Sequence, residues 1–111
     1  MQKNIVFIPI KQIKVNAYTI PTDFPESDGT MTWDSTTMIV VHISAVDITG
    51  FGYSYAPAAT VAFIKSTFTE LLTRMDAFAI SAAWNTMHSE IRNSGKCGIG
   101  AMAVSAVDNA L

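Results

Sequence analysis

A short acidic segment is the first candidate for chemistry in this sequence. Four carboxylates lie within Thr22–Asp34, and no lysine or arginine accompanies them there: Asp23, Glu26, Asp28 and Asp34. Carboxylate oxygens are ligands for hard cations. The spacing does not match a calcium-binding loop, because no glutamate follows Gly29 at the required place and Pro25 interrupts the run. We therefore interpret the segment as a solvated turn with Asp28 and Gly29 at its tip, and we predict no metal site in the chain.

Two histidines and one cysteine are the other candidates for catalysis or metal binding. His42 and His88 have no carboxylate or cysteine at ligand spacing, which favours structural roles. Cys97 has Lys96 beside it, but no histidine is near in the sequence to form a nucleophilic pair. We therefore predict no catalytic residue. A lone cysteine with no partner to oxidise is typical of a cytoplasmic protein.

A glycine-rich run and a group of aromatic residues are the remaining motifs. The run 95–100 precedes a predicted helix but matches no nucleotide-binding spacing, so its glycines are interpreted as allowing two helices to approach closely. Phe51, Tyr53 and Tyr55, together with Trp33, flank neighbouring predicted strands. They would meet at one end of a sheet, where a binding surface and plain packing are equally consistent with the pattern.

The elements that position these residues follow from hydrophobic periodicity. Alternating residues predict a strand over 13–20. A β-branched run that is apolar on both faces predicts a central strand over 36–45, and a third, short strand covers 51–55. After Pro57 the period changes to 3.6, which predicts one helix to Met75 and a second that stops at Ser94-Gly95. A third helix, Gly98–Leu111, has small or apolar residues on nearly every side. The predicted fold class is α+β, a three-stranded antiparallel β-meander followed by three helices.

Composition narrows the possible functions. The 111 residues carry a net charge of −2 and only 14% charged residues, so nucleic acid is an unexpected partner. No run of apolar residues is long enough to span a membrane. A mean hydropathy of +0.31 is high for a small domain and predicts either a homo-oligomer or a missing neighbour. The last helix reaches Leu111 with no stop signal, so we expect the chain to be cut within an element.

An ordered set of motifs carries a family resemblance over Lys11–Leu111. It consists of these segments: 18–23 (YTIPTD), 26–30 (ESDGT), 33–37 (WDSTT), 50–56 (GFGYSYA), 91–93 (IRN) and 103–111 (AVSAVDNAL). In this order the chain resembles the N-terminal capping domain of the mandelate racemase and muconate lactonizing enzyme group of the enolase superfamily. Residues Met1–Ile10 lie outside the pattern.

The resemblance implies a function for the whole chain, residues 1–111, as one capping domain. Relatives continue into a (β/α)₈ barrel, which carries the acid/base residues and binds Mg²⁺, and they act on a small carboxylate substrate such as an acid sugar. Proton abstraction next to the carboxylate then gives a racemase, cycloisomerase or dehydratase. The chain alone would be inert and would hold no cofactor.

Site residues are carried over from the resemblance one by one. Tyr53 matches the aromatic position of the second cap loop, which faces substrate in relatives, and Phe24 and Trp33 lie in the first loop. With Tyr55 from the aromatic group, they form the predicted substrate-binding set. Asp108 matches the acidic residue of the last helix of the cap, and the resemblance implies a structural role for it.

Two other functions remain open at this point. A stand-alone module could bind a small ligand, or oligomerise, through the aromatic end of the sheet. A small metalloenzyme built on the acidic segment is the weaker alternative.

Overall fold

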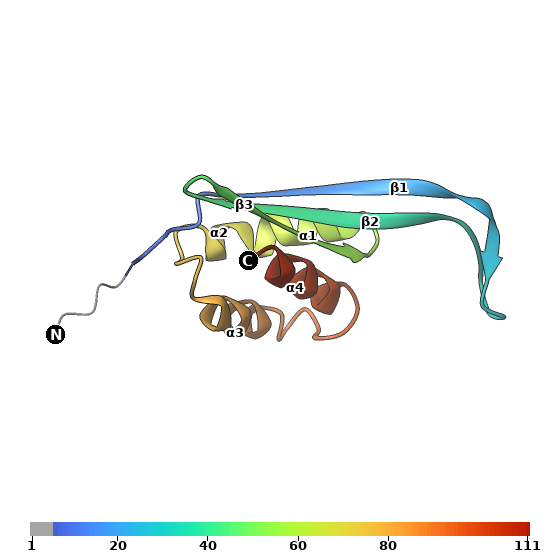
Figure 1. The fold of residues 1–111 in the computed structure, drawn as a ribbon. Coiled ribbons are helices and arrows are strands. Elements are labelled where there is room, and N and C mark those ends of the chain that lie inside the picture. The colour runs from blue at the N-terminus through green and yellow to red at the C-terminus, as the bar shows by residue number, and fades with distance from the viewer. Residues whose placement is uncertain (1–5) are drawn as a thin grey trace.

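A computed structural model describes residues 6–111, and in it the sheet forms one layer and the helices a second layer on one of its faces (Figure 1). The strands β1 (Gln12–Ser27), β2 (Thr32–Ala45) and β3 (Ile48–Tyr55) pair in the order β1-β2-β3, and both pairs are antiparallel. The helices follow as α1 (Ala59–Thr67), α2 (Thr69–Leu72), α3 (Ile80–Glu90) and α4 (Ile99–Ala110). The predicted α+β meander is confirmed.

The core lies between the inner face of the sheet and the helices. Alternate residues of β2 point into it, namely Ile39, Val41 and Ile43, and each is at most 4% exposed. The helices contribute a larger set of fully buried side chains, among them Ile64, Phe68, Leu72, Met87 and Val107. The intervening strand residues therefore face away from the helices, and this outer face carries the aromatic residues of β3.

The first predicted helix is divided into two. Phe68 separates α1 from α2, although its backbone N–H still donates to the Ile64 carbonyl, at 2.8 Å. The hydroxyl of Thr69 donates to that same carbonyl at 3.4 Å. A threonine hydroxyl that bonds back to a carbonyl of the preceding turn commonly bends a helix, which accounts for the break.

The 3.6-residue period predicts that the second helix has one apolar face: Ile80, Trp84, Met87, His88 and Ile91. The structure confirms this face only in part. Met87 and Ile91 are fully buried, as expected, but Ala83 completes the buried face. Trp84 is 41% exposed and stacks on His88, with ring centroids 4.5 Å apart, so this pair lies on the outside of α3.

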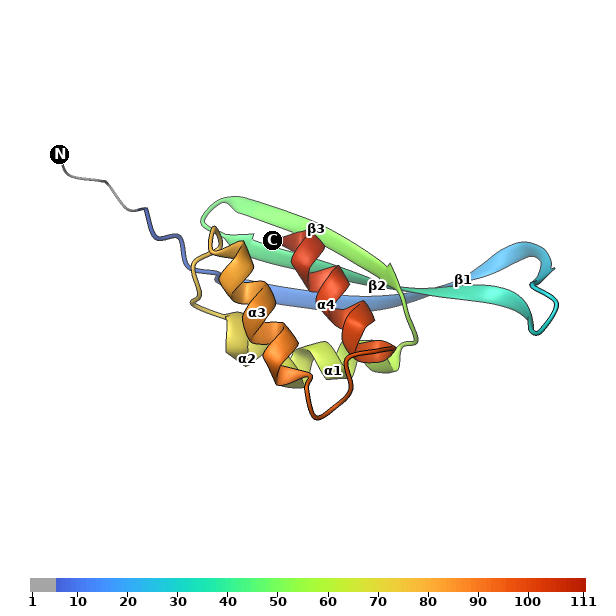
Figure 2. The same ribbon diagram turned by 90° about the horizontal axis from the view of Figure 1, so that it is seen from below.

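Helix α4 lies against β3 (Figure 2). Two glycines of β3 allow this close packing. A Cβ at Gly50 would meet the backbone of Ala110, and one at Gly52 would meet the carbonyl of Ala106 and the backbone of Ala110. The buried residues of α4 on this side are themselves small, notably Ala103, Ala106 and Ala110. The backbones can therefore approach closely.

Residues 8–10 of the N-terminal segment, which is outside the family resemblance, form part of the packed structure. Ile10 is only 1% exposed, and its backbone exchanges hydrogen bonds with Arg74 and Met75. The carboxylate of Asp76 accepts the backbone N–H of Ile8 at 3.3 Å and that of Phe78 at 3.1 Å. These contacts attach the segment to the connection between α2 and α3. The first part of the segment that falls outside the family pattern, Met1–Ile5, lies outside the described residues.

Candidate functional site

The acidic segment is a β-hairpin arm rather than the loop that the sequence predicted. β1 runs on through Pro21 and Pro25 to Ser27, and β2 begins at Thr32, so most of Thr22–Asp34 is strand, with Glu26 paired to Trp33 and Ser27 to Thr32. The register shifts between Pro21 and Glu26. Proline lacks a backbone N–H and is tolerated at edges and bulges, and β1 is an edge strand. The arm extends beyond the helical layer (Figure 1).

Asp28 shapes the tip of this arm. Its carboxylate accepts the backbone N–H of Thr30 at 3.0 Å, that of Met31 at 2.9 Å and the Thr30 hydroxyl at 2.8 Å. These bonds favour the ionised form and lower the pKa of Asp28 from 3.8 to about 2, the backbone bond from Thr30 having the largest effect. Gly29 supplies the positive φ of 92° that the turn requires. Asp28 is therefore engaged in the turn, as the sequence suggested.

The turn is expected to persist in acid. Because the folded pKa lies below the unfolded value, the contribution of Asp28 is complete above the unfolded pKa and is lost as the pH falls through about 2. Amide NMR signals of Thr30 and Met31 should therefore move with a midpoint near pH 2. The variant Asp28→Asn should remove this transition, and a midpoint at the ordinary value of 3.8 would contradict the hydrogen-bonded turn.

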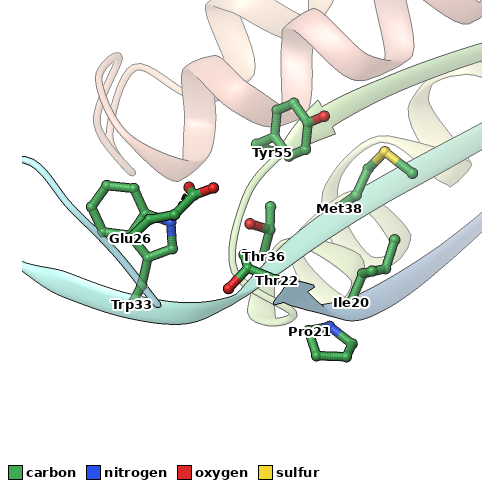
Figure 3. Close-up of a pocket in the computed structure, with 8 residues that line it drawn as sticks. All are labelled: Ile20, Pro21, Thr22, Glu26, Trp33, Thr36, Met38 and Tyr55. Carbon is green, nitrogen blue, oxygen red and sulfur yellow. Dashed lines mark hydrogen bonds between the residues drawn. The ribbon is translucent and has the colours of Figure 1, made fainter. Parts of the chain in front are cut away.

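A pocket of about 560 Å³ lies where the arm leaves the sheet (Figure 3). Both sides of the arm and the end of β3 supply its walls: Ile20, Pro21, Thr22, Glu26, Trp33, Thr36, Met38 and Tyr55. The pairing register of the three strands explains why these residues lie together. Met38 pairs with Tyr55 on one side and with Tyr18 on the other, which brings Tyr55 close to Ile20 on the outer face of the sheet.

One hydrogen bond joins the two sides of the arm inside the pocket. The indole N–H of Trp33 donates to a carboxylate oxygen of Glu26 at 3.2 Å, and the two residues are also partners in the strand register. Figure 3 shows the two side chains next to each other, with Tyr55 opposite them. The bond fixes the orientation of both side chains and leaves the second Glu26 oxygen available.

The structure brings together two of the four predicted site residues. Trp33 and Tyr55 line the pocket. Tyr53 lies one row along the same outer face, with its ring centroid 6.1 Å from that of Tyr55, and does not line the pocket. Phe24 is 80% exposed on the arm and is also outside the pocket walls.

The sequence did not identify several residues of the pocket. Ile20, Thr36 and Met38 gave no signal of a site, because only the pairing register places them together. Glu26 was considered only as a cation ligand. The pairing of Glu26 with the predicted residue Trp33 follows once residues 26 and 33 are recognised as facing each other across a hairpin with its tip at Asp28-Gly29.

The chemistry of the described residues does not fit a bound Mg²⁺. No group of three or more histidine, cysteine, aspartate or glutamate side chains within residues 6–111 could hold a metal ion. Asp28 accepts hydrogen bonds within its turn, and Glu26 is the one carboxylate among the eight residues that line the pocket. Cys97 is exposed and unpaired.

Solved structures with this fold reveal the family. The chain is 46% identical to a mandelate racemase/muconate lactonizing enzyme-like protein from Rubrobacter xylanophilus, with a TM-score of 0.89, over 92% of this chain and 28% of that one. The chain belongs to the mandelate racemase and muconate lactonizing enzyme group of the enolase superfamily. No family model and no curated protein sequence matches it.

Two other solved structures are similar to the chain. A racemase from Streptomyces coelicolor A3(2), solved with bound magnesium, is 28% identical over 91% of this chain and 30% of that one, with a TM-score of 0.87. L-talarate/galactarate dehydratase from Salmonella typhimurium LT2, solved with Mg and L-lyxarohydroxamate, is 20% identical over 99% of this chain and 32% of that one, with a TM-score of 0.83, and shares the fold. The chain thus spans about 28 to 32% of these proteins, as expected of an N-terminal domain.

Each helix within residues 6–111 falls short of the length and apolarity that a membrane span requires.

Proposed function

We propose that this chain is the capping domain of a Mg²⁺-dependent enzyme that removes the proton next to a carboxylate, with a (β/α)₈ barrel as its partner. The relatives support the partner, since the chain spans 28% of the Rubrobacter protein and a barrel typically needs about 250 residues. The described residues offer no metal-ligand set and no catalytic group, so both would belong to the barrel. The reaction would make the whole protein an isomerase or a lyase.

The pocket carries this proposal. Trp33 comes from the first of the two segments that the family resemblance assigns to lid loops, Tyr55 comes from the second, and both line one pocket. The walls combine three apolar side chains, Ile20, Pro21 and Met38, with a small set of polar groups, which is the usual composition of a ligand site. A barrel closing beneath the arm would complete the site, and the rings would exclude water from it.

A second feature supports the docking of the barrel. An apolar pocket of about 340 Å³ lies at the end of α4 where Leu111 is found, and it includes Ile43, Ile48, Phe78 and Ile80. Ile48 is 75% exposed and Phe78 is 67% exposed. Exposed apolar surface of this kind typically marks an interface. The apolar pocket at the end of α4 is therefore a suitable contact surface for a barrel domain that continues from this helix.

Homo-oligomer formation and a cytoplasmic location belong to the same proposal. Phe51 and Tyr53 support the first, since they are 55% and 48% exposed on the outer face of the sheet. Multi-angle light scattering over a range of protein concentrations would measure whether the chain forms homo-oligomers. The lone free Cys97 supports the second.

The natural gene product tests the barrel partner. We expect the reading frame to continue past the codon for Leu111 into a barrel, and intact-mass measurement of the protein from its native cells to give a mass at least about three times that of this chain. A stop codon directly after Leu111, with no separate barrel frame in the same transcript, would overturn the proposal.

A further inference from the structure

The polar groups of the pocket are mostly hydrogen-bond acceptors. The Glu26 carboxylate has one oxygen bonded to Trp33 and a second without a partner among the described residues. Thr22 donates its hydroxyl proton to the Phe24 carbonyl at 2.8 Å, so its oxygen can only accept from a ligand. The indole N–H of Trp33 is already used by Glu26. Thr36 and Tyr55 are left as the two hydroxyls that can donate.

No cation compensates for Glu26. The eight lining residues include no lysine, arginine or histidine. A carboxylate entering this part of the pocket would face another carboxylate at close range, and it has no proton to donate. A hydroxyl group, by contrast, can donate to Glu26 or to Thr22 and can accept from Thr36 or Tyr55.

We propose that Glu26 makes this cap selective for a substrate whose far end is an uncharged, polyhydroxy chain. The substrate would be a sugar monoacid rather than a sugar diacid. Ile20, Pro21 and Met38 would contact the C–H groups of that chain, and its hydroxyls would bond to Glu26 and to the threonines. This assignment of the substrate rests on the proposed capping function, since the reacting carboxylate would be held by the barrel. Charge repulsion supplies the selection against a second carboxylate.

The binding preference can be measured on the 111-residue chain alone. NMR titrations would follow the Trp33 indole N–H signal, identified with the variant Trp33→Phe, as glucitol, gluconate or galactarate is added. Glucitol and gluconate should move the signal over similar concentration ranges. Galactarate should need an at least about threefold higher concentration to move the signal as far, and added salt should reduce this difference in concentration.

Two variants with the same change in net charge separate a local effect from a general one. Glu26→Gln keeps the size and one acceptor but removes the charge, so galactarate should then bind within about twofold of gluconate. Asp34→Asn removes a charge from the exposed arm, outside the pocket walls, and should leave the preference unchanged.

Several results would overturn the inference. They are galactarate binding as tightly as gluconate to the unmodified chain, identical behaviour of the two variants, and no movement of the Trp33 signal with any ligand. Glucamine binding about tenfold more tightly than glucitol would show that the pocket selects a cation instead. These titrations need no barrel, so failure of the capping function would be seen separately, in the loss of a barrel partner or of activity.

Discussion

Replacing Gly52 by alanine is expected to destabilise the domain by about 3 kcal/mol. The added methyl group would meet the backbone of α4 at Ala106 and Ala110, and a helix backbone cannot rotate away as a flexible side chain can. To accommodate the methyl group, α4 must move off β3, which loosens the buried contacts of Val107 and its neighbours. Urea unfolding followed by circular dichroism measures the change.

Ser54→Ala on the same strand is the matched control. Ser54 is partly exposed and already carries a Cβ, so alanine there adds no atom, and the unfolding free energy should stay within about 0.5 kcal/mol of that of the unmodified chain. Equal stability of the Gly52 and Ser54 variants would show that the close contact between β3 and α4 does not hold in solution.

Tyr55→Ala is expected to lower kcat/KM by about 10- to 100-fold in an enzyme that contains this cap. The pocket would lose one of its two aromatic walls and one of its two hydroxyl donors. A suitable enzyme is a chimera in which this chain replaces the matching 28% of the Rubrobacter relative. Steady-state kinetics with a substrate of that relative gives the measurement.

Tyr53→Ala provides the comparison within the same chimera. The sequence favoured Tyr53 as the substrate contact, whereas Tyr55 is the tyrosine that lines the pocket. We expect the Tyr53 variant to lose less than about threefold in kcat/KM. A larger loss at Tyr53 than at Tyr55 would mean that the sequence-based assignment is correct and that the pocket is not the substrate site.

Much of the fold could be predicted because its elements follow their hydrophobic periods. The strand over 36–45 was predicted from its apolar run, and Ile39, Val41 and Ile43 are buried; the last helix, predicted to be apolar nearly all round, buries one side and leaves Ile99 and Met102 exposed. The segment Thr22–Asp34 could not be predicted in the same way, since two prolines and several acidic residues are typical of a loop. Edge position and the register shift let Pro21 and Pro25 remain within a strand, and neither property is visible in a local window of sequence.

The candidate site was harder to predict than the fold for a similar reason. Residues 20, 38 and 55 are far apart in sequence and meet only through the pairing of three strands. Tyr53 and Tyr55 lie on the same face of β3, and only the pairing register decides that Tyr55 rather than Tyr53 lies opposite Met38. Sequence reasoning could therefore identify the aromatic end of the sheet, but it could not choose between Tyr53 and Tyr55 by register.

The most direct test of the capping role is Mg²⁺-dependent exchange of the proton next to the carboxylate, measured in D₂O. The chimera, the Rubrobacter protein shortened by the matching 28% of its chain and the intact Rubrobacter protein would be compared on the same carboxylate substrates. We expect the chimera to exchange that proton and the shortened protein to be slower by about 100-fold or more. Equal exchange by the chimera and the shortened protein would contradict the claim that this chain closes the active site.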